Sequence, residues 1–262
     1  MRISQCKLNN MEEIATRGFM KRYSLKKYKD RNSPAIFYGL GGSRDLQRHN
    51  SMAVVIWRGS DIVKFKSKRK FKFLKKKNVY NIAISSFIVK DIEGSGVRFK
   101  FIPIASTDFS IFNPCKLGNE IYTYVPCKSN EKHIKRYGLK IINKIIKNVE
   151  YKVNIISYEN RCSQKQLVKI YERCFCGLRL TKHDGLPNQV VEMALMGRRS
   201  IYNGELPGSI KWRDKNFENI IYNINKEAKK IGTTNYKLSY DMRKYLDVGD
   251  SWMNTKFWKK DN

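Results

Sequence analysis

Short apolar runs alternate with polar, helix-like stretches along most of this chain of 262 residues. In the first part of the chain the runs fall at residues 35–38, 53–57, 79–85 and 97–104. Each run is almost continuously apolar, and the stretches between runs are long enough for helices. The pattern therefore predicts parallel strands joined by crossover helices, which is an α/β fold.

A stretch near residues 106–118 has prolines, a Gly-Asn turn signal and no clear period, so we place a domain boundary there. A second alternating series follows. Its strands are predicted at 121–125, 152–156, 174–179 and 200–202. Its helices are predicted at 131–148, 163–173, 188–196 and 217–230, with further helices between residues 238 and 260. We therefore expect two doubly wound domains, residues 1–110 and 111–262, with residues 1–30 as a basic extension that is partly helical or disordered.

Cationic side chains dominate the composition, with 53 Lys and Arg against 23 Asp and Glu and a net charge of +30. A field of this size speeds association with polyanions such as nucleic acid, anionic lipid headgroups or a phosphorylated glycan. The richness in Lys, Asn, Ile and Tyr leaves AT-biased codon usage as an alternative cause. No apolar stretch has the length of a signal peptide or membrane span, so we expect a cytoplasmic location, in the host cell if the protein is viral.

The six cysteines are scattered, which predicts neither a zinc site nor a disulfide framework. An Asp-x-Asp dyad is also missing from the sequence. We therefore expect no metal and no cofactor, and nothing indicates an obligate protein partner.

The most informative segment covers residues 177–197 and reads GLRLTKHDGLPNQVVEMALMG. It predicts a strand that ends at Arg179, a polar loop, and a helix with Pro187 in its first turn, where proline is favourable. Ligands of open α/β sheets bind outside the carboxyl ends of the strands, where a helix N-terminus offers backbone N–H groups to a phosphate. We therefore place a ligand site at this loop.

The side chains of this loop suit a nucleotide sugar. Arg179 and Lys182 would neutralise a diphosphate leaving group as the glycosidic bond breaks. His183 and Asp184 are candidates for hydrogen bonds to sugar hydroxyls, and Glu192 for hydrogen bonds to the ribose. The alternatives are surface roles for the two cations and for Glu192, a turn role for His183, and a helix-dipole role for Asp184.

The nine residues DGLPNQVVE, from Asp184 to Glu192, resemble the E-x7-E motif of retaining GT-B glycosyltransferases, with Asp in place of the first Glu. The resemblance covers about residues 35–212. It implies two Rossmann-like domains facing each other across a cleft, with C-terminal helices packing back on the N-terminal domain. It also implies that Asp184 contacts the transferred sugar and that Glu192 binds the ribose. The donor-lining residues between them are Gly185, Leu186, Pro187 and Asn188.

The first domain carries the same resemblance. Residues 53–61, AVVIWRGSD, are similar to the second strand and following loop of GT-B N-terminal domains, and Gly41 and Gly42 would let the backbone approach the donor phosphates. Arg58 and Asp61 are acceptor-side candidates, with mutual pairing in a loop as the alternative. The resemblance implies that the leaving phosphate assists the acceptor hydroxyl. For an inverting reaction, the candidate bases are His49 and Asp61.

The acceptor half is the more basic per residue, because residues 1–100 carry 24 Lys and Arg against 7 Asp and Glu. Residues 64–77, KFKSKRKFKFLKKK, mix cations with phenylalanines, as in surfaces that neutralise a nucleic-acid backbone and contact bases. The alternative is a solvated, charged connector. The candidate acceptor-side cations are Lys64, Lys66, Lys68, Arg69, Lys70 and Lys72.

These patterns lead us to expect a retaining, metal-independent hexosyltransferase with a nucleotide-sugar donor such as UDP-glucose. The favoured acceptor is hydroxymethylated pyrimidine in phage duplex DNA. The first alternative is a peripheral-membrane enzyme that builds a surface glycan on an anionic lipid carrier. The second is a non-catalytic nucleic-acid-binding protein.

Overall fold

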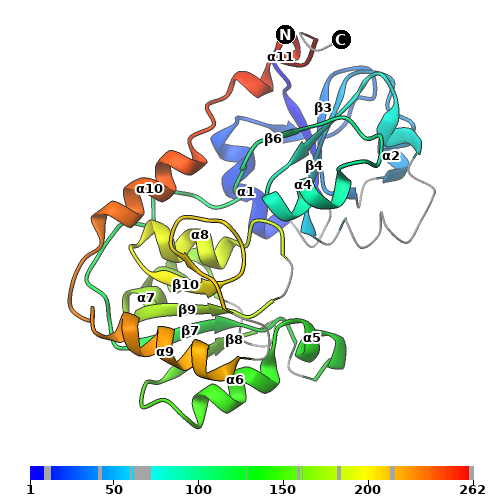
Figure 1. The fold of residues 1–262 in the computed structure, drawn as a ribbon. Coiled ribbons are helices and arrows are strands. Elements are labelled where there is room, and N and C mark those ends of the chain that lie inside the picture. Colours follow the sequence, from blue (N-terminus) through cyan, green and yellow to red (C-terminus); the bar gives the residue numbers. More distant parts are fainter. Residues whose placement is uncertain are drawn as a thin grey trace. The chain divides into compact units, whose positions relative to one another are not determined.

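The computed structural model describes residues 1–8, 13–40, 43–59, 61, 72–127, 129–157, 160, 162–181, 184–212 and 216–259. The chain forms two compact units (Figure 1). Unit 1 contains Met1–Asp108 together with Leu246–Asn262, and unit 2 contains Phe109–Tyr245. No helix in the described residues is both long and apolar enough to cross a membrane.

Unit 1 is built on a six-stranded parallel sheet with the order β2-β1-β3-β4-β5-β6. The two fully buried apolar runs form its centre, since β3 (Ala35–Tyr38) and β4 (Ala53–Trp57) have every residue buried. Both strands have the predicted bounds. The remaining elements of the sheet and its crossovers are β5 (Val79–Ala83), β6 (Phe99–Phe101), α2 (Ser43–Gln47), η2 (Lys72–Lys75) and α4 (Ser86–Ile92).

The prediction that residues 1–30 form an extension is wrong. They supply β1 (Gln5–Lys7), α1 (Glu13–Arg22) and β2 (Lys26–Lys27), and β1 pairs with β3 inside the sheet. The strand escapes a pattern-based prediction because it is three residues long and mostly polar. Its Gln5 is buried and exchanges four hydrogen bonds with the backbone of Lys29, Asp30 and Ser33.

The C-terminal segment completes unit 1 through η3 (Ser251–Met253) and α11 (Thr255–Lys259). Its aromatic residues are the anchors, because Trp252 and Trp258 are each 1% exposed. The Trp258 indole donates to the Trp252 carbonyl over 2.7 Å, and Trp252 packs edge-on against Tyr23 of the N-terminal segment. The two ends of the chain are thus held in one core.

Unit 2 contains a five-stranded parallel sheet with the order β11-β10-β9-β7-β8. Its strands are β7 (Glu120–Tyr124), β8 (Val153–Ile156), β9 (Cys174–Arg179), β10 (Arg199–Tyr202) and β11 (Ser209–Ile210). Its helices are α5 (Glu131–Arg136), α6 (Leu139–Ile146), α7 (Gln164–Glu172), α8 (Asn188–Leu195), α9 (Phe217–Ala228) and α10 (Tyr236–Leu246). The prediction of an α/β fold with parallel sheets is confirmed.

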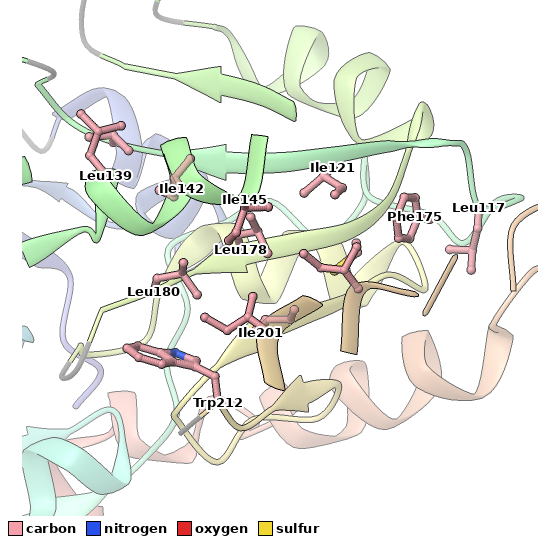
Figure 2. Close-up of a cluster of buried hydrophobic side chains, with 14 residues drawn as sticks. Leu117, Ile121, Leu139, Ile142, Ile145, Phe175, Leu178, Leu180, Ile201 and Trp212 are labelled. Atoms are coloured by element: carbon pink, nitrogen blue, oxygen red, sulfur yellow. The ribbon is translucent and has the colours of Figure 1, made fainter. Parts of the chain in front are cut away.

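One face of this sheet is covered by α6 and α9, whose isoleucines interlock with β7 and β9 (Figure 2). Helix α8 lies on the other face (Figure 1). The single helix predicted over residues 131–148 is instead two, because Gly138 adopts a left-handed conformation with φ of 68°. A Cβ there would approach Leu180, so glycine suits both the backbone angle and the close contact.

A fully buried cation, Arg198, hydrogen-bonds to the C-terminal ends of α7 and α8 in unit 2. Arg198 is 0% exposed and donates to six backbone carbonyls. Tyr171 and Glu172 end α7, Cys174 begins β9, Met196 caps α8, and Cys115 and Lys116 precede β7. Helix C-termini carry partial negative charge, so the ends of α7 and α8 favour a guanidinium at this position.

We expect Arg198→Met to destabilise unit 2 by at least about 3 kcal/mol, because it orphans several buried carbonyls at once. Hydrogen-exchange mass spectrometry of the β9 peptide measures the opening free energy of this unit directly. The matched control is Arg199→Met, since the adjacent Arg199 is exposed and should change stability by less than about 0.5 kcal/mol. Equal effects of the two substitutions would contradict the role assigned to Arg198.

Candidate functional site

The loop that follows β9 is at the centre of unit 2, because β9 lies between β7 and β10 in the sheet. The strand ends at Arg179, and the next helix, α8, begins at Asn188. Parallel strands bring their carboxyl ends to one edge, which is where open α/β sheets bind ligands. The structure therefore places the predicted segment in the position expected of a ligand site.

Arg179 and Asp184 form an ion pair inside this loop. The Arg179 Nε donates to Asp184 Oδ2 over 2.8 Å, and Nη2 contacts the same oxygen. Burial alone would lower the pKa of Arg179, but the charge of Asp184 outweighs it and keeps the guanidinium protonated. The guanidinium also lies 4.7 Å from the ring centroid of Tyr137. The positive charge of Arg179 at the strand end and the negative charge of Asp184 in the loop thus neutralise each other.

The loop is held in shape by further hydrogen bonds. Asp184 Oδ1 accepts from the Gly185 N–H over 2.9 Å, and the Tyr202 hydroxyl of β10 donates to the Gly185 carbonyl over 3.2 Å. Burial, and then the charge of Asp184, raise the pKa of Tyr202, so this donor stays protonated. A Cβ at Gly204 would lie 2.2 Å from the Tyr202 ring, so glycine is required for Tyr202 to reach the loop.

Helix α8 begins under this loop with Pro187 as its N-cap, and Leu186 is buried beside it. The carbonyl of Pro187 accepts from the N–H groups of Val190 and Val191. In the first turn, the Gln189 amide donates to the Leu178 carbonyl over 3.0 Å and so joins the helix to β9. Sequence reasoning missed Gln189. The available signal was a second amide side chain, directly after Asn188 and before the apolar residues of this helix.

Glu192 is a buried carboxylate, 4% exposed, in the middle of α8. Its Oε2 accepts from the hydroxyl of Tyr171, on α7, over 2.9 Å. Tyr171 is 1% exposed, and its ring packs edge-on against Tyr122 of β7 at a centroid distance of 4.7 Å. Burial raises the pKa of Tyr171 well above its usual value, and the charge of Glu192 adds to this effect, so the hydroxyl stays protonated and can donate to the carboxylate.

This buried environment excludes the alternative in which Glu192 is an exposed acid on the helix surface. A buried carboxylate is costly without hydrogen bonds, and Tyr171 supplies one from a neighbouring helix. Sequence reasoning missed Tyr171 and Tyr122 because they lie far from the motif in the chain. Two of the predicted site residues, Lys182 and His183, lie outside the described residues.

The carboxyl ends of β3 and β4 in unit 1 are joined by Asp61. Its Oδ1 accepts from the Leu40 N–H over 3.0 Å, and its Oδ2 accepts from the Arg58 N–H over 2.8 Å. Gly39 has a φ of 82°, and a Cβ there would lie 3.3 Å from Asp61 Oδ2. Both carboxylate oxygens of Asp61 therefore brace the two loops, which favours the structural alternative for this residue. The Arg58 guanidinium lies 5.6 Å from the centroid of the Tyr38 ring.

His49 does not lie with Asp61. It precedes β4, at the amino end of the strand, whereas Asp61 follows the carboxyl end. Its Nδ1 is 3.2 Å from the Tyr28 hydroxyl and its Nε2 is 3.2 Å from the Met52 carbonyl. Burial lowers the pKa of His49. The structure therefore does not bring the two candidate bases together.

The remaining predicted residues of unit 1 divide into two groups. Lys72 is exposed at the start of η2, which precedes β5 and so approaches the amino end of that strand. The others lie outside the described residues: Gly41, Gly42, Lys64, Lys66, Lys68, Arg69 and Lys70. Among the residues that the structure describes, no cluster of three His, Cys, Asp or Glu side chains is placed to hold a metal ion.

Comparison with known proteins supports the fold. No protein family and no curated protein sequence matches this chain. Sucrose-phosphate synthase from Thermosynechococcus elongatus aligns with 92% of the chain at a TM-score of 0.54 and 9% identity, over 74% of its own length. A trehalose-6-phosphate synthase aligns with 96% at 0.55 and 9%, over 77% of its length.

The glycosyltransferase TarM aligns with 88% of the chain at a TM-score of 0.56 and 12% identity. This chain spans 55% of the length of TarM. All three solved structures are GT-B glycosyltransferases, so the predicted GT-B class is confirmed as the fold of this chain.

The Tyr171–Glu192 contact makes a direct prediction about stability. A double-mutant cycle with Tyr171→Phe and Glu192→Leu should give a coupling energy of about 1–3 kcal/mol, because either single change removes the hydrogen bond between two buried groups. Chemical denaturation of the four proteins, followed by far-UV circular dichroism, measures it. Additive effects within about 0.3 kcal/mol would contradict the hydrogen bond.

Proposed function

We propose that this protein is a glycosyltransferase that takes a hexosyl group from a nucleoside-diphosphate sugar. The observation that carries the proposal is the buried carboxylate of Glu192. Glu192 lies on α8, the helix that begins after the Asp184 loop, and accepts a hydrogen bond from Tyr171 of α7. The GT-B fold and the resemblance of residues 184–192 to the E-x7-E motif support it. Glu192 and the motif both lie at the same edge of the unit 2 sheet.

The geometry of α8 suits a nucleotide donor. Glu192 follows Asn188 by four residues, which is about 6 Å along the axis at the rise of an α-helix. A carboxylate at that depth would accept from ribose hydroxyls while the N–H groups of the first turn hold the diphosphate. UDP was bound to a single-residue variant of S. aureus TarM, whose structure aligns at a TM-score of 0.50 and 13% identity. We propose UDP-glucose or a similar UDP-hexose as the donor.

The Arg179–Asp184 pair adjoins this first turn. In the proposed complex Asp184 contacts hydroxyls of the transferred sugar, while the ion pair with Arg179 holds the carboxylate in its orientation. Growing charge on the diphosphate would be met by the helix N-terminus and Lys182. In this proposal the loop binds the sugar, and the first turns of α8 bind the nucleotide.

The reaction we propose is retaining and independent of a metal. The bond between the anomeric carbon and the diphosphate oxygen breaks, and the acceptor oxygen bonds to the same face of the sugar. The acceptor proton passes to the leaving diphosphate, so no protein base is needed. The hydrogen bonds that occupy both oxygens of Asp61 and both ring nitrogens of His49 agree with this scheme.

The acceptor we propose is a hydroxymethylated pyrimidine in duplex DNA, in a phage-infected host cytoplasm. Its support is electrostatic, since the net charge is +30 and the N-terminal hundred residues are the more basic per residue. An anionic lipid carrier presents a similar charge and is the competing acceptor. A chain that only binds nucleic acid would bind DNA without using the donor.

Removal of the Glu192 carboxylate tests the donor site. Glu192→Ala should lower kcat/KM for the donor at least about 100-fold, because the ribose loses a charged acceptor. It should also abolish preference for a ribose over a 2′-deoxyribose donor, which steady-state kinetics of both donors would report. The control is Glu172→Gln, an exposed acid on α7 that should retain parental kinetics. Unchanged turnover in Glu192→Ala would refute the site assignment.

Transfer itself is tested with a panel of nucleotide sugars and three acceptors: hydroxymethylated duplex DNA, unmodified duplex DNA, and vesicles containing a phosphorylated lipid carrier. Nucleoside mass spectrometry should detect a hexosylated pyrimidine only in the first, and chelation of divalent ions should leave the rate within about twofold. Transfer to the vesicles alone would replace the DNA proposal with the lipid one. DNA binding without transfer from any donor would establish the non-catalytic alternative.

A further inference from the structure

A row of exposed cations runs along the amino ends of four neighbouring strands of unit 1. Arg31 precedes β3, Arg48 precedes β4, Lys76 and Lys77 precede β5, and Arg98 precedes β6. All five side chains are exposed. Because the sheet is parallel, these positions share one edge, and we call the five residues the amino-end rim.

The loops of the amino-end rim are joined to one another. The Arg31 carbonyl accepts from the N–H groups of Asn50 and Ser51, at 3.0 and 3.3 Å. The Ser51 carbonyl accepts from the Asn78 amide over 2.7 Å, and Arg98 donates to the Lys77 carbonyl over 3.4 Å. The four loops therefore form one continuous ledge.

The loop that contains Arg31 is held in place by Gln5 of β1. Its amide donates to the carbonyls of Asp30 and Ser33, and its Oε1 accepts from the N–H groups of Lys29 and Asp30 at 3.0 and 3.1 Å. Fixed loops reduce the entropy that a binding partner must remove. The amino-end rim is thus a preorganised array of charge.

Charge on this ledge is unbalanced. The same loops contain two acidic side chains, Asp30 and Glu93, whereas the amino-end rim contains five cations. Hydrogen bonds from Ser33 and then from the Asn32 N–H lower the pKa of Asp30, so it stays ionised. From β3 to β6 is three strand spacings, or roughly 14 Å, a span over which duplex DNA presents several phosphates on its two strands. The array matches a polyanion in both sign and spacing.

The chemistry between the cations favours nucleic acid over a membrane. Asn32 and Asn50 are exposed in the same loops, where the Asn50 amide donates to Asn32 Oδ1 over 3.0 Å, and amide side chains commonly donate to phosphate backbones. The large exposed apolar residues in the described part of the chain lie elsewhere, for example Phe101, Ile146, Tyr222 and Tyr240. A membrane-binding surface would need such anchors among its cations.

We propose that the amino-end rim is a docking surface for duplex nucleic acid, which it contacts through the phosphate backbone. This edge is opposite the carboxyl ends of the same strands, where Asp61 and Gly39 lie. Docking here holds a long polymer by contacts that carry no sequence information, separately from any contact at a reacting nucleotide. The proposal does not depend on the donor or on transfer.

The test measures binding of the full chain to a labelled duplex of about 24 base pairs of ordinary sequence, by fluorescence anisotropy at several salt concentrations. Replacement of all five rim cations by Gln should weaken binding at least about 10-fold at about 0.1 M salt. It should also reduce the slope of log K against log salt by about four, close to one per phosphate contact. Arg31→Gln and Arg48→Gln should each reduce the slope by about one.

The matched control removes the same charge from unit 2, by Gln at Lys135, Lys140, Lys147, Lys165 and Lys169, which are all exposed. We expect it to change the slope by less than about one, since no phosphate contact is assigned to these lysines. Equal losses in both variants would show diffuse attraction and overturn the docking surface. So would a rim variant that loses affinity for vesicles rich in anionic lipid but keeps its affinity for the duplex.

Thermal unfolding of each variant keeps the result interpretable, because these exposed side chains should shift Tm by no more than about 2 °C. Donor binding, measured separately, should be unchanged in the rim variant. Loss of duplex binding with intact donor binding supports the rim. Failure of the donor site would instead appear in the Glu192 variants while the rim slope stays as expected.

Discussion

Unit 2 depends on one buried charge, the guanidinium of Arg198. A cation without a carboxylate partner is stable in a protein interior only when its donors are used and its charge is compensated. Six carbonyls meet the first requirement, and the C-terminal ends of α7 and α8 meet the second. Because those carbonyls come from α7, α8, the start of β9 and the segment before β7, one side chain fixes their spacing.

The candidate site follows from that spacing. Tyr171 accepts from Arg198 through its carbonyl and donates to Glu192 through its hydroxyl, so the buried cation and the buried carboxylate are joined through one residue. Glu192 is thereby fixed at mid-helix, and the first turn of α8 is fixed beneath the loop that holds Arg179 and Asp184. The buried part of unit 2 thus determines the position of the candidate site.

The sequence predicts those features that depend on residues close together in the chain. The strands β3, β4 and β9 are apolar runs, and the motif loop is set by the carboxyl end of β9 and by Pro187. What it leaves out depends on partners far along the chain. Arg198 reads as a surface cation next to Arg199, and the Tyr171 hydroxyl reaches an acid 21 residues away. The strand β1 is polar and is recognisable only once β3 lies beside it.

The two edges of the unit 1 sheet differ in a way that composition alone conceals. At the carboxyl ends of β3 and β4, the charge of Asp61 is satisfied by backbone N–H groups, so this edge is internally compensated. At the amino ends, side chains hold the loops through amides and carbonyls, and the cations extend into solvent. Crowded like charges raise the free energy of the folded chain, and a polyanion relieves that repulsion. The proposed duplex partner would account for cations that are ordered along one edge of the sheet, an order that codon usage by itself does not predict.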